Sequence, residues 1–122
     1  MGAEVITFSR HSKGVHIPVF VTHDQEGKYV RIPQGLLQKK RDEGWFDYSR
    51  RLWVGVYEAN ARDDIRLTVH LKLSEADRML HELNTWAFCA KMVDGGVLWQ
   101  AVEERLAGLS IHGIRFKLDL AE

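Results

Sequence analysis

The chain has 122 residues, 45% of them apolar, and its 17 Lys and Arg balance its 17 Asp and Glu. This length predicts one domain, residues 1–122; the composition argues against disorder, and zero net charge argues against a strongly basic protein that coats nucleic acid. Cys89 is the sole cysteine, no apolar run approaches the ~20 residues of a membrane span, and the first residues lack a leader pattern, so we expect a cytoplasmic protein without disulfides or a membrane segment.

The N-terminal third predicts a meander of three strands. Residues 4–9, 15–22 and 29–32 alternate in the manner of strands, with turns between them. Pro18 cannot donate a ladder hydrogen bond, so we expect its strand to lie at an edge or to be bulged. Residues 34–41 then predict a short helix that Gly44 ends, whereas residues 45–51 fit neither pattern clearly.

Residues 52–58 and 65–73 predict a β-hairpin joined by the loop 59–64. Leu52, Val54 and Val56 would share its inner face with the apolar residues of the second strand. On the outer face, Trp53 would lie opposite His70 and Tyr57 opposite Arg66, which leaves Gly55 between the two aromatic residues.

The C-terminal part predicts two helices and a returning strand. A helix over about 75–92 follows Ser74 and Asp77, which resemble a capping box, and residues 94–96 break it. A second helix covers about 97–108, and a last strand, about 111–120, has His112 on its inner side. The side chains expected in the core include Leu67, Val69, Leu83, Trp86, Leu106 and Phe116. These elements predict the α+β class, with a mainly antiparallel sheet and both C-terminal helices on one face.

The chemistry-bearing residues predict no metal, no cofactor and no catalytic site. The spacing of the six histidines fits neither helical nor strand metal pairs, and Cys89 lies in an apolar helix pattern. Asp94 argues against an anion beside Gly95 and Gly96. His11, Lys13 and His16 keep one alternative open, a small nuclease that uses histidine as general acid and base.

Two surfaces are candidates for binding. The first is the outer hairpin face with Trp53, Tyr57, Arg66 and His70, which would suit a protein interface or single-stranded nucleic acid, unless a helix or loop simply covers it. The second is the segment 39–51, which mixes cations with aromatic residues. Its candidate binding residues are Lys39, Lys40, Arg41, Trp45, Tyr48, Arg50 and Arg51. Interleaved acids favour a protein partner of mixed charge there, although such a segment can also be a solvated helix end whose aromatic side chains enter the core.

These observations together favour a non-enzymatic binding protein, an adaptor or inhibitor, that acts through contacts with a partner protein or with a second copy of itself as a homodimer. Small neutral domains of this kind are common among accessory proteins of phages and mobile elements. A module for single-stranded nucleic acid is the second expectation, and the histidine-based nuclease is the third.

Overall fold

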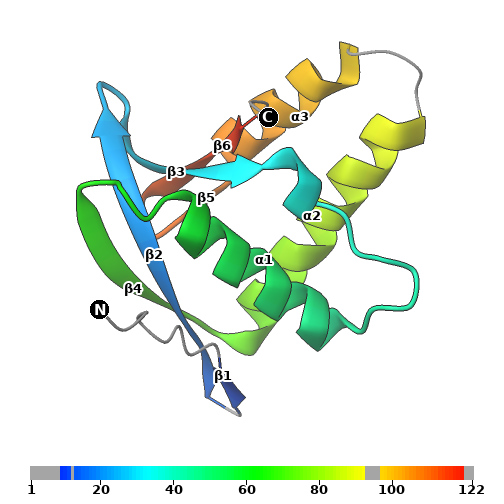
Figure 1. The fold of residues 1–122 in the computed structure, drawn as a ribbon, viewed down its shortest axis with the longest axis horizontal. Helices are drawn as coiled ribbons and strands as arrows, with labels where there is room; N and C mark the ends of the chain where they lie inside the picture. Colours follow the sequence, from blue (N-terminus) through cyan, green and yellow to red (C-terminus); the bar gives the residue numbers. More distant parts are fainter. Residues whose placement is uncertain (1–8, 12, 93–96, 120–122) are drawn as a thin grey trace.

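The computed structural model describes residues 9–11, 13–92 and 97–119, with side chains described over 13–86 and 101–119. The described strands are β1 (Ser9–His11), β2 (Gly14–Asp24), β3 (Gly27–Pro33), β4 (Ile65–Leu71), β5 (Ser110–Ile111) and β6 (Ile114–Asp119). The described helices are the short 3-10 helix η1 (Gln34–Leu36), α1 (Trp45–Ala59), α2 (Leu73–Met92) and α3 (Val97–Gly108). Figure 1 shows the strands curving around one side of α1. The α+β class predicted from the sequence is confirmed.

The strands form one six-stranded sheet. Its order is β1-β2-β3-β6-β5, and β4 pairs with β2. Only the β3–β6 pair is parallel, from Tyr29 opposite Arg115 to Pro33 opposite Asp119, so the described sheet is mixed. A parallel pair needs a long crossover, and the connection from β3 to β6 contains α1, β4 and the two C-terminal helices.

The prediction of a β-hairpin over 52–58 and 65–73 is wrong, because residues 45–59 form the helix α1. Gly44, expected to end a helix, is instead its extended N-cap, with φ −71° and ψ 160°. The alternation of Leu52, Val54 and Val56 does not indicate a strand here, because the residues between them are also apolar or aromatic. The segment therefore has no polar face. The side chains that α1 buries repeat at helical spacing, and they are Tyr48, Ser49, Leu52, Trp53, Val56 and Tyr57.

Helix α1 lies where β2 and β3 separate. The two strands pair only from Thr22 opposite Tyr29 to the turn, and α1 packs against both beyond that point. β2 pairs with β1 over its first residues, so the stretch around Pro18 pairs only with β4, and the expected edge position holds locally. The carboxamide of Asn60, directly after α1, bonds both backbone groups of Arg31 on β3, at 3.0 Å to the N–H and 2.8 Å to the carbonyl. Asn60 thus replaces the missing strand partner.

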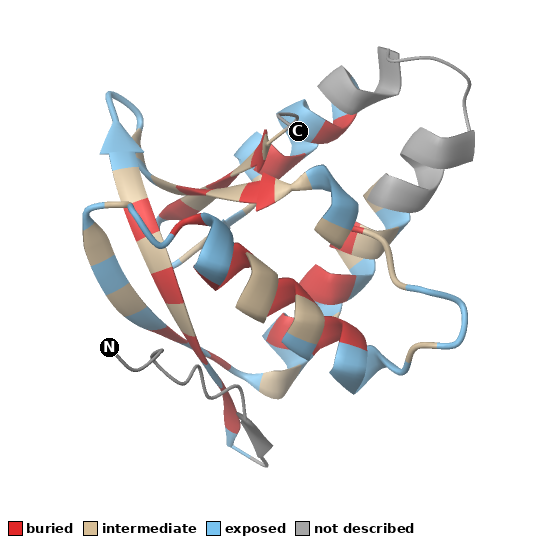
Figure 2. Cartoon of the chain, viewed as in Figure 1, coloured by how far each residue is buried: buried red, intermediate tan, exposed pale blue. Residues whose placement is uncertain are grey.

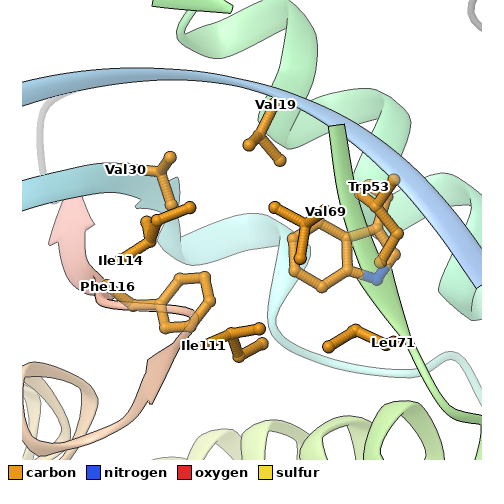
Figure 3. Close-up of a pocket in the computed structure, with 9 residues that line it drawn as sticks. Val19, Val30, Trp53, Val69, Leu71, Ile111, Ile114 and Phe116 are labelled. Carbon is orange, nitrogen blue, oxygen red and sulfur yellow. The ribbon is translucent and has the colours of Figure 1, made fainter. Parts of the chain in front are cut away.

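The core lies between the sheet, α1 and the C-terminal helices (Figure 2). Of the expected core residues, Val69, Leu83, Leu106 and Phe116 are buried, whereas Leu67 and Trp86 are half-buried against them. Trp53 points into the apolar interior beside Val69 and opposite Phe116 (Figure 3). The free volume there is about 10 Å³, room for at most one water, so this interior is a packed core rather than a ligand cavity.

The last strand begins later than expected because His112 lies in a turn. His112 and Gly113 have φ of 52° and 79°, and Ile111 pairs with Ile114, which is the geometry of a tight hairpin between β5 and β6. His112 is therefore exposed rather than inward. Residues 4–8 of the first expected strand and the break at 94–96 lie outside the described residues.

Candidate functional site: the start of helix α1

The segment that leads into α1 is held in place by side chains. The Tyr48 hydroxyl donates to the Leu37 carbonyl at 2.6 Å, and the Lys39 N–H donates to Asn84 Oδ1 at 2.8 Å. Arg51 donates to both carboxylate oxygens of Glu43, at 2.8 and 2.9 Å. These bonds fix a chain segment that has no regular secondary structure between η1 and α1.

Trp45 and Phe46 are the large apolar side chains that stay exposed among the described residues, at 37% and 42%. The Trp45 ring lies 4.2 Å from the His81 ring of α2, and Lys39 Nζ lies 5.2 Å from the Trp45 ring centroid. We call Trp45 with its neighbours Lys39 and His81, together with Phe46, which follows Trp45 in the chain, the Trp45–Phe46 patch. Two adjacent aromatic side chains at a fixed helix start beside a cation have the composition of an interface centre.

The outer face of α1 continues this surface. An open hollow of about 620 Å³ runs along it and is lined by Leu36, Asp47, Arg50, Arg51, Val54, Gly55 and Glu58. Gly55 has no side chain, so Leu36 of η1 lies against the helix; an added Cβ would come within 2.7 Å of it. The surface beside the patch therefore combines an apolar floor with charges of both signs.

The electrostatics of the segment are dominated by the Glu43–Arg51 pair. The hydrogen bonds from the Arg51 guanidinium lower the pKa of Glu43 from 4.5 to about 2. Burial of the Tyr48 ring raises the pKa of its phenol, which stays neutral and serves as a donor to Leu37. Both groups thus hold the segment in place and present neither free charge nor a reactive oxygen.

The sequence-predicted residues of this segment divide into two sets. Tyr48 is fully buried and Arg51 is engaged with Glu43, so both support the segment from within. Lys40, Arg41, Trp45 and Arg50 are exposed, and Lys39 is half-buried beside Trp45. Phe46, His81 and Leu36 were not among the predicted residues. A helical reading of 45–59 would have found Phe46, because it places that side chain on the turn next to Arg50.

The first predicted surface does not exist as an open face. Trp53 and Tyr57 are 4% and 5% exposed, because α1 turns both toward the sheet. Tyr57 packs against Phe20, with ring centroids 4.8 Å apart, and the guanidinium of Arg66 lies 5.7 Å from the Tyr57 ring. Arg66 and Tyr57 do meet, but as a strand residue covering a buried helix residue.

The structure brings two histidines together. His70 of β4 lies opposite His16 of β2 on the outer face of the sheet, and their rings stack with centroids 4.5 Å apart. Within the described residues, no group of three or more His, Cys, Asp or Glu is arranged to hold a metal ion. The side chains of His11 and Cys89 lie outside the described part.

Comparisons with protein-family models, with curated proteins and with solved structures found no match for this chain. Among the described residues, no helix has both the length and the apolar character needed to cross a membrane.

Proposed function

We propose that this chain is a non-enzymatic, cytoplasmic protein-binding module that acts as an adaptor or inhibitor, with the Trp45–Phe46 patch as its docking centre. The observation that carries the proposal is the exposure of Trp45 and Phe46 in a chain whose other large apolar side chains are buried or half-buried throughout the described part. Aromatic side chains dominate binding hot spots because they bury much surface at a small cost in conformational entropy.

The rigid support beneath the patch favours the same proposal. Trp45 is held between the His81 and Tyr48 rings, at 4.2 and 6.0 Å, and the preceding segment is fixed by Asn84. A side chain that is already ordered loses little freedom on binding, so more of the contact energy contributes to affinity.

The charges around the patch favour a protein partner over single-stranded nucleic acid. Lys40, Arg41 and Arg50 are exposed in the same stretch of chain, but Asp42 and Asp47 are exposed there too and would repel phosphates. A partner with charges of both signs can match this rim. A second copy of the chain is one such partner.

Site-specific photo-crosslinking in cells of the source organism tests the proposal. p-Benzoylphenylalanine at position 46 should yield a discrete crosslinked protein, whereas the same group at position 104, exposed on α3, should not. A crosslinked dimer would identify the partner as a second copy. Crosslinks to nucleic acid would support the nucleic-acid module instead, and equal crosslinking at both positions would contradict the proposed patch.

A further inference from the structure

The side of helix α1 that faces away from the sheet carries an ordered stripe of side chains. Asp47, Arg50, Val54 and Glu58 follow one another at intervals of three or four residues, which places them on one side of the helix. Arg50 and Glu58 are exposed, and Val54 between them is half-buried. The stripe therefore has an apolar centre with a cation one turn before it and an anion one turn after it.

The apolar centre extends beyond the helix to η1. Leu36 lies against Gly55, where an added Cβ would come within 2.7 Å of the Leu36 side chain. Leu36 and Val54 are the apolar side chains of the open hollow of about 620 Å³, and both are only half-buried. A helix that lies in this hollow would cover both of them.

We propose that two copies of the chain associate through this face, with their α1 helices antiparallel and the twofold axis at Val54. In such a pair, each residue before Val54 lies opposite the residue equally far after it in the other copy. Arg50 of each copy therefore lies opposite Glu58 of the other, which gives two ion pairs between the copies. Val54 meets its own equivalent at the axis, with Leu36 beside it. Because the chain has no net charge, no long-range repulsion opposes the encounter.

Other arrangements of two α1 helices oppose like charges. A parallel pair places Arg50 opposite Arg50 and Glu58 opposite Glu58. An antiparallel pair with its axis between Arg50 and Arg51 opposes these two cations. An antiparallel pair with its axis between positions 52 and 53 opposes Asp47 and Glu58. The proposed register is the one among these that pairs opposite charges, which favours it over the alternatives.

This face is separate from the Trp45–Phe46 patch. Val54 follows Trp45 by nine residues, or about two and a half helical turns, so the two side chains leave α1 on opposite sides. Trp45 accordingly contacts His81 of α2, whereas Val54 borders the hollow beside η1. A dimer through α1 therefore leaves Trp45 accessible to a different partner.

Charge-reversal variants studied by sedimentation equilibrium test this dimer. Wild type should associate reversibly to a dimer. Arg50→Glu alone and Glu58→Arg alone each place like charges opposite one another twice, and each should weaken self-association at least about tenfold. An equimolar mixture of the two variants should associate within about threefold of wild type, because every Glu then lies opposite an Arg. Restored association in the mixture also shows that both variants are folded.

Matched charge reversals away from α1 provide the control. Arg78→Glu on α2 and Glu104→Arg on α3 change exposed residues and should leave self-association unchanged. A cysteine tests the position of the axis. In a chain that carries Cys89→Ser, Val54→Cys should form a disulfide-linked dimer on oxidation, because the two copies of position 54 face each other, whereas Glu104→Cys should not.

Three results would overturn the inference. A wild-type chain that stays monomeric at millimolar concentration would exclude the dimer, and crosslinks from position 46 to another protein would then leave the proposed function intact. A mixture that associates no better than its two components, or control variants that weaken association as much as Arg50→Glu, would exclude the two ion pairs. Failure of Val54→Cys to form a disulfide-linked dimer would exclude the proposed axis.

Discussion

Helix α1 carries two pairs of aromatic residues, of which one is buried and the other exposed. Trp53 and Tyr57 are four residues apart, lie on the face turned toward the sheet and are buried to about the same extent. Trp45 and Phe46 are adjacent in the first turn of the helix and stay exposed. Spacing and place along the helix, rather than residue type, decide which pair stabilises the fold and which is available to a partner.

The local surroundings reinforce this difference. Around Trp53 the side chains are apolar and come from several strands, including Val69 and Phe116. Around Trp45 they are mixed: His81, Lys39 and Tyr48. The first environment leaves Trp53 only 4% exposed, while the second leaves more than a third of the Trp45 surface accessible. Substitutions at the two pairs, and at the residues that support each pair, test this difference.

Truncation of the buried pair should have the largest effect. Trp53→Ala leaves a cavity beside Val69 and should lower the free energy of unfolding by about 3–5 kcal/mol. Urea unfolding followed by circular dichroism measures it. Leu83→Ala, at another buried position, is the matched control and should cost about 2–5 kcal/mol. A Trp53→Ala loss below about 1 kcal/mol would mean that this side chain is not core.

Removal of the Asn60 carboxamide should be nearly as costly. Asn60→Ala leaves the N–H and carbonyl of Arg31 without their partner at the gap between β2 and β3, at a cost of about 2–4 kcal/mol. Asn84→Ala, which removes one bond to the segment beneath Trp45, should cost about 1 kcal/mol. Equal losses would show that the gap is not held by Asn60.

The Glu43–Arg51 pair predicts a smaller, pH-dependent effect. The pKa of Glu43 is about 2 in the fold against 4.5 ordinarily, so the unfolded chain binds the proton first as pH falls. The stabilisation is complete above about pH 5 and is lost as pH falls toward 2, by about 1 kcal/mol after solvent screening. Unfolding of wild type and Glu43→Gln between pH 2 and 7 tests this. Parallel pH profiles for the two proteins would contradict it.

Truncation of the exposed pair should have the smallest effect on folding. Trp45→Ala combined with Phe46→Ala should change the free energy of unfolding by less than about 1 kcal/mol, because neither side chain is in the core. The same double variant should weaken partner binding by about 2 kcal/mol or more. A loss of stability comparable to that of Trp53→Ala would remove the contrast between the two pairs.

Much of the fold could be predicted from periodicity alone. The strands around 15–22, 29–32 and 65–73 and both C-terminal helices have patterns that fit one period only, and the structure places them within a few residues. Residues 45–59 fit both periods, because almost every position from Leu52 to Tyr57 is apolar. A glycine at the N-cap position, Gly44, and the acidic Asp47 in the first turn are the local sequence signals that favour the helix.

The candidate site was predicted in part. The cations and aromatic residues of the segment 39–51 predict a binding surface, and the structure leaves Lys40, Arg41, Trp45 and Arg50 exposed there. The roles of Tyr48 and Arg51 could not be predicted, because they depend on Leu37 and Glu43, whose positions are fixed only by the folded segment. The bond between Asn84 and Lys39 joins residues 45 apart in the chain and has no local signal.

The claim that Trp45 is available to a partner while Trp53 is buried is tested most directly by ¹⁹F NMR of 5-fluorotryptophan-labelled protein. The resonances are assigned by single Trp→Phe variants. The partner identified by crosslinking is titrated into the labelled protein. We expect the Trp45 resonance to shift or broaden on binding while the Trp53 resonance stays in place. Complex formation that leaves Trp45 unchanged, or that shifts Trp53 as much as Trp45, would contradict it.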